Sequence, residues 1–390
     1  EPLSEAEIQI RRYSNRRDDD FGIREGEERL FQFNLFSIIT HGTEARFGTI
    51  SADFEFYSNW KDIFPEEYKV IKIDGENEKT QEVLIHGMLN KEIMLDVLRH
   101  FTLFMEIKEG TEVKIVCRYQ QYRAVGKILE RLREGESGKE RSGVVWHTQG
   151  SGKSLTMVFL VRKLRSSEDL KDFKVIMVND RTDLEDQLSE TAKLTGEKVN
   201  IVDKRRNLRP VLSNDSSNLN MVMVHKFLEE EIRHSKALMK AYVEECIVPE
   251  FKPFEVVNES DRVLMLVDEA HRTQGGNMGD NLFTAFPKAT KVAFTGTPLL
   301  TQRHKVKTHE RFGKFIDQYK IKQSVRDRAT LDIVYIGRTS KDKIKDAEAF
   351  HTEFEDVFRE RTQEERLEIQ KRYGTMRDYL ENMDRLRKIA

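Results

Sequence analysis

The sequence predicts an α/β fold, a doubly wound parallel sheet with helices on both of its faces. Two observations predict it. Short, nearly continuous apolar runs are typical of strands that are buried on both faces, and amphipathic helical stretches separate these runs. A glycine-rich loop follows the first run, at the kind of strand end where such sheets carry functional loops. We expect the strands at residues 143–148, 174–180, 220–226, 262–270 and 291–298.

Composition indicates a globular protein of more than one domain. The chain has 390 residues, 38% of them hydrophobic, which is enough for sizeable cores. Its 66 Lys and Arg nearly cancel its 68 Asp and Glu, so any basic surface for nucleic acid must be local. The two cysteines, Cys117 and Cys246, lie far apart, which excludes a disulfide framework and a zinc-type spacing. No apolar run is long enough for a membrane helix, so we expect no membrane association and a cytoplasmic protein.

The region before about residue 100 has a mixed α/β pattern of its own. A helix is expected from Ser4 to Tyr13, with Ser4 as the N-cap and Glu7 completing a capping box. Beyond about residue 340, charged helix formers dominate, which favours a solvated helical connector. Strand-like runs in the first region occur at 35–40, 46–50 and 54–57.

The loop after the first expected strand of the sheet has the composition of a phosphate-binding loop. The usual pattern is G-x-x-x-x-G-K-[ST], and this chain matches it except for His147 at the first position. Backbone N–H groups of the loop would surround the phosphates. Lys153 would reach the β- and γ-phosphates, and the Ser154 hydroxyl would bind Mg²⁺. A flexible surface turn is the alternative for such a stretch. The expected ATP-binding residues are Thr148, Gln149, Gly150, Ser151, Gly152, Lys153 and Ser154.

Asp268 and Glu269 follow the fourth apolar run directly. Two carboxylates at the end of a buried strand are costly unless they are paired or bind a metal, and a nucleotide with Mg²⁺ would supply the reason. Asp268 would hold Mg²⁺ through water, while Glu269 would orient and deprotonate the attacking water. Catalysis is therefore assigned to Lys153, Asp268 and Glu269, with ATP and Mg²⁺ as cofactors.

The order of a phosphate loop, Asp-Glu-Ala-His and Thr-Gly-Thr-Pro along the chain resembles that of superfamily 2 helicases and translocases. The resemblance implies a RecA-like motor domain in which Thr295, Gly296 and Thr297 link ATP hydrolysis to movement on DNA. It also implies that the segments containing Arg181 and Lys226 contact the DNA backbone.

Gln121 lies in the sequence Arg-Tyr-Gln-Gln-Tyr ahead of the phosphate loop. This sequence resembles the segment of the same family whose glutamine reads adenine, and Gln121 is the residue that we expect to do so. A glutamine that is merely solvated at the start of a helix is an equally weighted alternative.

A narrower resemblance covers nearly the whole chain. The phosphate loop with its His147, the sequence from Val267 to Gln274, and segments 34–62 and 311–319 are similar to the restriction (motor) subunit of type I restriction–modification enzymes. The resemblance implies an N-terminal restriction-endonuclease-like domain, a second motor domain that supplies an arginine, and double-stranded DNA as a partner. It also implies methyltransferase and specificity subunits and a bacterial or archaeal source.

The nuclease domain of that family carries an Asp, then Glu-x-Lys, then Gln-x-x-x-Tyr. Gln9 and Tyr13 match the last element, and we expect the first two upstream of Glu1. The Glu-x-Lys sequences of this chain all follow Gln9, and about three are expected by chance in so charged a sequence, so we reject them as metal ligands. The alternative for Gln9 and Tyr13 is a helix face that packs on the sheet. Among them are the sequences that begin at Glu67, Glu106 and Glu112.

These observations predict three regions. Residues 1–105 would be the C-terminal part of an endonuclease-like domain, 106–320 the first RecA-like motor domain, and 321–390 a charged, largely helical connector with the start of the second motor domain. The intact protein would hydrolyse ATP, move on double-stranded DNA and cleave it far from the recognition site. The chain starts without Met, and we expect a piece that lacks complete nuclease and ATPase sites. Two alternatives are a superfamily 2 helicase or remodeller without nuclease function, and a nucleotide-gated docking module.

Overall fold

The structure is a computed structural model that describes ten stretches of the chain between Pro2 and Leu331. Residues 1–331 form one compact unit. None of the described helices is both long and apolar enough to span a membrane. The described residues are 2–16, 25–50, 52–66, 79–108, 111–179, 192–202, 204–227, 254–270, 277–300 and 307–331.

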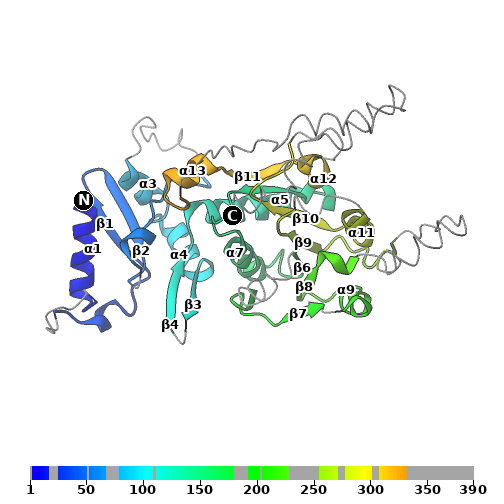
Figure 1. Ribbon diagram of the computed structural model, residues 1–390, viewed down its shortest axis with the longest axis horizontal. Coiled ribbons are helices and arrows are strands. Elements are labelled where there is room, and N and C mark those ends of the chain that lie inside the picture. Colours follow the sequence, from blue (N-terminus) through cyan, green and yellow to red (C-terminus); the bar gives the residue numbers. More distant parts are fainter. Residues whose placement is uncertain are drawn as a thin grey trace, which may run out of the picture. The chain divides into compact units, whose positions relative to one another are not determined.

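A seven-stranded sheet organises the larger part of this unit (Figure 1). Its strands lie in the order β11-β5-β10-β9-β6-β8-β7, and every neighbouring pair is parallel. The predicted α/β fold class with a RecA-like parallel sheet is therefore confirmed. The strands are β5 (Gly143–His147), β6 (Lys174–Asn179), β7 (Val199–Val202), β8 (Leu219–Met223), β9 (Val263–Val267), β10 (Thr290–Thr295) and β11 (Phe315–Tyr319).

The sheet has two strands more than the sequence predicts. Both β7 and β11 lie at its edges, and polar residues such as Asn200 and Asp317 interrupt their apolar runs. Three predicted strands also end too late. The strand β8 stops at Met223 and continues as the 3₁₀ helix η5 (Val224–Phe227), β9 stops at Val267, and β10 stops at Thr295. The polar residues that follow these three strands therefore lie in the connections at the carboxyl edge of the sheet.

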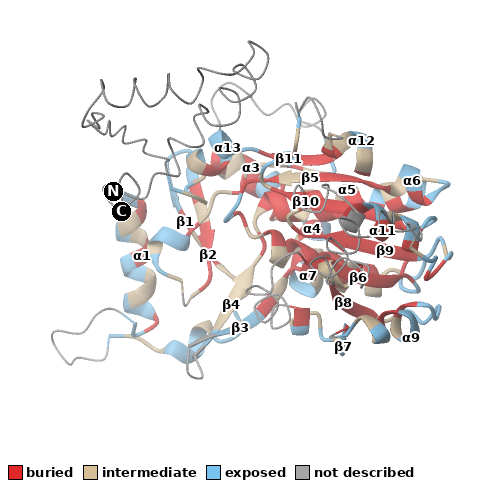
Figure 2. Cartoon of the chain, turned by 45° about the vertical axis from the view of Figure 1, so that its right-hand side comes forward, coloured by how far each residue is buried: buried red, intermediate tan, exposed pale blue. Residues whose placement is uncertain are grey.

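Side chains on the two faces of the sheet enter separate cores. In β9, Leu264 and Leu266 belong to one hydrophobic cluster, whereas Val263, Met265 and Val267 belong to the other. Figure 2 shows the inner strands, such as β9 and β10, as buried, whereas the edge strand β7 is largely intermediate or exposed. The first core contains side chains of α5 (Tyr119–Glu134) and α7 (Lys153–Ser166), and the second contains those of α9 (Leu208–Leu212), α11 (Asn277–Ala285) and α12 (Thr308–Phe312). Three short helices complete this part: α6 (Gly138–Arg141), η4 (Arg205–Asn207) and α13 (Ile321–Arg326).

The N-terminal part contains helices and two antiparallel strand pairs. The pairs are β1 with β2 and β3 with β4. Its α/β composition agrees with the prediction, while the boundaries at 105 and 320 and the nuclease-like character of this part stay predictions. The elements are α1 (Pro2–Tyr13), η1 (Glu28–Phe31), β1 (Ser37–His41), β2 (Glu44–Gly48), η2 (Phe54–Phe56), α3 (Thr80–His86), α4 (Lys91–His100), β3 (Thr102–Lys108) and β4 (Thr111–Val116).

Two local predictions for the N-terminal part are wrong. Helix α1 already begins at Pro2, a residue that suits the first helical turn because it has no N–H to satisfy, so Ser4 is inside the helix and is not its N-cap. Glu7 pairs with Arg11 one turn later. The run at 54–57 forms the 3₁₀ helix η2 and not a strand. Its aromatic residues favour β structure only where a partner strand is available.

A short stretch after η2, residues 60–64, packs against helix α5. We call it the 60–64 segment. The rings of Trp60 and Phe64 lie 5.8 and 6.5 Å from the ring of Tyr122 in α5. A Cβ atom at Gly126, one helical turn further, would overlap the Phe64 ring. The absence of a side chain at Gly126 therefore lets the N-terminal part approach α5 closely.

Candidate functional site

The phosphate-binding pattern forms a tight loop between β5 and α7. Gly150 and Gly152 have φ angles of +80° and +86°, a left-handed conformation that glycine adopts without steric cost. The loop is tied to the edge strand β11, because both the backbone N and the Oγ1 of Thr148 donate to the carbonyl oxygen of Tyr319 at 2.9 and 3.0 Å. Ser151 Oγ closes the turn by donating to the Thr148 carbonyl oxygen at 2.5 Å. The loop is thus shaped by glycine geometry and by contacts to β11.

Gln121 contacts this loop from the first turn of α5. Its Nε2 donates to the carbonyl oxygen of Gly152 at 3.0 Å, and its Oε1 accepts from the backbone N of Arg118 at 2.9 Å. A Cβ atom at Gly152 would lie 2.6 Å from Gln121 Nε2. Gln121 is buried, so the alternative of a solvated glutamine is wrong. A role in reading adenine stays a prediction.

The acidic pair lies across the same edge of the sheet. The strand β10 separates β5 from β9, and Lys153 Nζ spans this distance to lie 3.6 Å from Glu269 Oε1. Asp268 Oδ1 accepts a hydrogen bond from the backbone N of Glu269 at 2.9 Å. Glu269 has a φ of +45°, an unfavourable conformation for a residue with a side chain, and such conformations concentrate at functional sites. The structure therefore brings Lys153, Asp268 and Glu269 together.

The electrostatics of this edge suit a bound cation. Burial raises the pKa of Asp268, and the nearby positive charge of Lys153 opposes that shift. Magnesium is commonly bound by one or two carboxylates together with phosphate and water oxygens, and Asp268 with the Ser154 hydroxyl in the first turn of α7 offers such oxygens. Within the described residues, no group of three or more His, Cys, Asp or Glu could hold a metal. These residues fit a cation that arrives with a nucleotide.

The Thr-Gly-Thr segment at the end of β10 touches the phosphate loop. The carbonyl oxygen of Gly296 accepts from Trp146 Nε1 at 3.0 Å. A Cβ atom on Gly296 would lie 2.9 Å from the backbone N of Gln149, so glycine permits this close approach. Buried Thr295 accepts at its Oγ1 from the backbone N of Thr297 at 3.2 Å. The contacts supply a physical connection between the two segments, and motor coupling stays a prediction.

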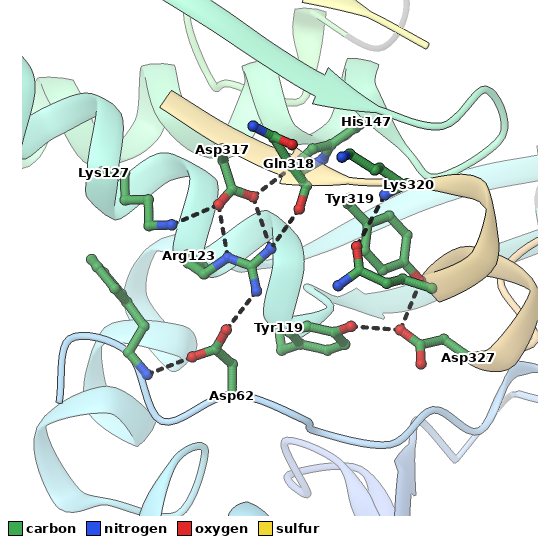
Figure 3. A network of polar contacts seen from close by, with 12 residues as sticks. Asp62, Tyr119, Arg123, Lys127, His147, Asp317, Gln318, Tyr319, Lys320 and Asp327 are labelled. Atoms are coloured by element: carbon green, nitrogen blue, oxygen red, sulfur yellow. Dashed lines mark hydrogen bonds and ion pairs between the residues drawn. The ribbon is translucent and has the colours of Figure 1, made fainter. Parts of the chain in front are cut away.

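His147, at the unusual first position of the loop pattern, is completely buried and belongs to a polar network (Figure 3). Its Nε2 lies 2.8 Å from Asp317 Oδ2 in β11. Asp317 also accepts from Arg123 Nε and Nη2 at 2.8 and 2.9 Å and from Lys127 Nζ at 2.8 Å. Burial alone would raise the pKa of Asp317, but the hydrogen bonds from His147 and Arg123 hold it well below its usual range. Asp317 is therefore ionised and acts only as a hydrogen-bond acceptor.

The protonation of His147 follows from this partner. Burial lowers the pKa of His147, although the hydrogen bond to Asp317 opposes the shift. A neutral imidazole beside an ionised carboxylate carries its proton on the nitrogen that donates, which is Nε2. Among the described residues, its other nitrogen, Nδ1, has no hydrogen-bond partner. The ring is thus held by one hydrogen bond, at Nε2, and by an edge-to-face contact with Tyr319, at 5.8 Å between ring centroids.

The N-terminal part contributes two side chains to the same network. Arg123 Nη1 donates to Asp62 Oδ2 at 2.5 Å. Asp327 accepts from the hydroxyls of Tyr119 and Tyr319 at 2.6 and 2.8 Å, and Lys61 Nζ lies 2.8 Å from its other oxygen. The sequence alone does not predict a role for these residues. A lone carboxylate in the short apolar run of β11 is a signal for a buried partner, but it does not identify that partner.

Other predicted site residues lie away from this centre or outside the described residues. Gln9 and Tyr13 in α1 are both exposed, so the alternative that they pack on the sheet is wrong, and their nuclease role stays a prediction. Lys226 lies half-buried in η5, after β8, while Arg181 lies outside the described residues. Of the rejected Glu-x-Lys sequences, the one at Glu112 lies in β4, that at Glu106 in β3, and that at Glu67 outside the described residues.

Comparison with known families matches residues 120–367 to the SWI2/SNF2 ATPase family. The type I restriction enzyme HindI endonuclease subunit of Haemophilus influenzae is 32% identical over 327 residues, which cover 78% of this chain and 29% of that protein. The type I restriction enzyme SsaAORF53P endonuclease subunit of Staphylococcus saprophyticus is 26% identical over 307 residues, covering 76% and 29%. This chain thus spans less than a third of these relatives. The predicted resemblance to type I restriction motor subunits is confirmed.

Two solved structures are also similar to parts of the chain. One is a nuclease-deletion mutant of the type ISP restriction–modification enzyme LlaGI in complex with a DNA substrate mimic, with a TM-score of 0.33, 15% identity, and coverage of 54% of this chain and 20% of that one. The other is the Sulfolobus solfataricus SWI2/SNF2 ATPase core in complex with double-stranded DNA, with a TM-score of 0.32, 13% identity, and coverage of 52% and 34%.

Proposed function

This chain belongs to the SWI2/SNF2 ATPase family, and we propose that it is the ATP-binding motor part of a type I restriction subunit. One observation carries the proposal. Lys153 of the phosphate loop lies 3.6 Å from Glu269, next to buried Asp268, at the carboxyl edge of a parallel sheet. A cation, a carboxylate base and a helix N-terminus converge there, as phosphoryl transfer to water requires.

Each residue of the site has a distinct task in this proposal. Backbone N–H groups of the loop, backed by the N-terminus of α7, would bind the phosphates of ATP. Lys153 would exchange its contact with Glu269 for the β- and γ-phosphates, which releases Glu269 to orient and deprotonate the attacking water. Ser154 and Asp268 would hold Mg²⁺, which when bound offsets negative charge on the phosphates. Gln121, next to Gly152, would contact the adenine.

In the intact protein, hydrolysis would drive movement along double-stranded DNA. Thr295, Gly296 and Thr297 would link the two because Gly296 contacts the phosphate loop, and Arg181 and Lys226 would contact the DNA backbone. Methyltransferase and specificity subunits would be the partners, and cleavage would occur far from the recognition site in a bacterial or archaeal cytoplasm. We infer that the catalytic arginine and the acidic nuclease residues belong to other parts of that protein.

A titration of the chain with a fluorescent ATP analogue and Mg²⁺ tests the core of this proposal. Wild-type protein should bind, and Lys153→Ala should weaken binding on the order of 100-fold, because it removes a buried cation that pairs with phosphate. Lys171→Ala, which removes an exposed charge paired with Glu168, should leave nucleotide affinity unchanged and serves as the charge control. Equal affinity of the Lys153→Ala and wild-type proteins would refute the phosphate-loop assignment.

A further inference from the structure

His147 occupies the first position of the phosphate-loop pattern, where the general pattern has glycine. We propose that Asp317 and Arg123 are positioning residues for the phosphate loop that act through His147, and that Asp62 of the 60–64 segment completes their arrangement. Docking of the N-terminal part would then set the nucleotide affinity of the motor. The inference rests on the proposed ATP binding and adds a regulatory connection to it.

The first step is the attachment of the loop to Asp317. His147 is the last residue of β5, and its Nε2 is hydrogen-bonded to Asp317. The next residue, Thr148, donates hydrogen bonds to the carbonyl oxygen of Tyr319. Both contacts lead to β11, so the start of the loop is held by a side chain and a main chain of the same strand. Displacement of the Asp317 carboxylate would free the imidazole and leave Thr148 as the remaining attachment of the loop entry to β11.

The second step is the orientation of Asp317 by Arg123. The guanidinium donates to both Asp317 oxygens, a two-point geometry that fixes direction as well as distance. Its remaining terminal nitrogen donates to Asp62. Arg123 is therefore held from two sides by carboxylates, one from β11 and one from the N-terminal part. Figure 3 shows the guanidinium between Asp317 and Asp62.

The third step is the independent anchoring of Asp62. Trp60 and Phe64, on either side of it in sequence, pack against Tyr122, the residue before Arg123 in α5. Lys61 forms an ion pair with Asp327, which also accepts a hydrogen bond from the hydroxyl of Tyr319. The 60–64 segment thus binds α5 through aromatic contacts and reaches the loop through ionic ones. A contiguous set of contacts runs from the loop through His147, Asp317 and Arg123 to Asp62.

Reciprocity makes this arrangement testable. If the docked segment favours the loop conformation that binds nucleotide, nucleotide must stabilise docking by the same free energy. Contiguous contacts alone do not demonstrate such coupling, so the measurement has to be of coupling itself. Asp62→Asn keeps the shape of the side chain and removes its charge, and Arg123→Lys keeps the charge and removes the two-point geometry.

The experiment measures the affinity of the chain for the fluorescent ATP analogue with Mg²⁺ in four proteins: wild type, each single variant and the double variant. Asp62→Asn should weaken binding about five-fold or more, and Arg123→Lys at least as much. The double variant should match Arg123→Lys within about two-fold, because Asp62 acts through Arg123. Affinity of a folded Asp62→Asn protein within about two-fold of wild type, or multiplied effects in the double variant, would overturn the proposal.

A matched control lies on the same helix. Arg133, near the end of α5, pairs with Asp169 at 2.7 Å on an exposed surface, so Asp169→Asn makes the same chemical change away from the loop. It should leave nucleotide affinity at the wild-type value. Loss of affinity in the control would show that α5 responds to any charge change and would remove the support for a specific connection.

Hydrogen exchange in the wild-type protein provides a readout that needs no variant to fold. ATP with Mg²⁺ should slow exchange of backbone amides in residues 57–64, and unchanged exchange in a nucleotide-saturated sample would contradict the proposal. Lys153→Ala separates the two levels of inference. If Lys153→Ala loses binding but Asp62→Asn does not, only the regulatory connection fails. If the wild type itself does not bind, the proposed function fails and this inference with it.

Discussion

Asp268 and Asp317 are both buried carboxylates of one parallel sheet, but their surroundings differ. Asp317 in β11 accepts hydrogen bonds from His147, Arg123 and Lys127, and these hold its pKa low. Asp268, after β9, accepts from a backbone N–H, and burial raises its pKa. A carboxylate whose charge is compensated inside the protein stabilises the fold. One whose charge is poorly compensated favours a ligand that brings positive charge.

The largest expected effect belongs to the ligand-facing side of this comparison. Glu269→Gln removes the proposed base beside Asp268 while keeping the shape of the side chain, so ATP turnover should fall roughly 10²- to 10⁴-fold. Nucleotide affinity should stay near the wild-type value. The measurement is steady-state phosphate release by the intact protein that carries this chain, with analogue binding in parallel. Wild-type turnover would remove Glu269 from the mechanism.

Asp317→Asn tests the internally compensated side. The substitution leaves Arg123 and Lys127 without their shared carboxylate, and breaking a buried pair in this way typically costs about 3–5 kcal/mol. We expect a value near the lower end, because Asp62 still binds Arg123. Urea unfolding measures the change. Asp169→Asn, which breaks the exposed pair with Arg133, should leave the midpoint unchanged, and equal losses in both variants would contradict the distinction.

Gly152→Ala tests whether the ligand-facing edge depends on its backbone geometry. Gly152 and Gly196 have nearly the same φ, +86° and +83°, but only at Gly152 would a Cβ atom meet another group within 4 Å. Both Ala variants should lose about 1–2 kcal/mol for the left-handed conformation. Only Gly152→Ala should also displace Gln121 and weaken nucleotide binding. Thermal unfolding and analogue titration separate the two effects, and equal nucleotide affinity in both variants would show that the Gln121 contact is dispensable.

The smallest expected effect is a gain in stability. The pKa of Asp268 is higher in the folded state than in the unfolded state. The contribution of Asp268 to the free energy of unfolding is therefore favourable below its unfolded-state pKa and is lost as pH rises through its folded-state pKa. At pH 7 the ionised group therefore destabilises the fold, and Asp268→Asn should raise the denaturant midpoint slightly. The gain should be lost as pH falls below the ordinary pKa of an aspartate, because the group is then protonated in both states. Denaturant midpoints across this pH range check the sign, and a loss of stability at pH 7 would contradict it.

The two sides of the comparison also differ in how well the sequence predicts them. The phosphate loop and the Asp268–Glu269 pair follow apolar runs, and strand ends of a parallel sheet meet at one edge, so their meeting could be predicted. The strand β11 could not, because Asp317 interrupts its short apolar run. Its partner Arg123 is 194 positions away in sequence. No periodic pattern identifies a side-chain partner at that separation, and burial of a charge is visible only after the partner is known.

The pairing of His147 with Asp317 has a consequence for exchanging parts between ATPases. A loop grafted from a relative with glycine at the first position would leave Asp317 without its imidazole donor and open a cavity beneath the strand. A graft in the opposite direction would require a carboxylate in the recipient protein to accept the hydrogen bond of the buried imidazole. The unit to transfer is therefore the loop together with the first turns of α5 and with β11, which lies far from both in the chain.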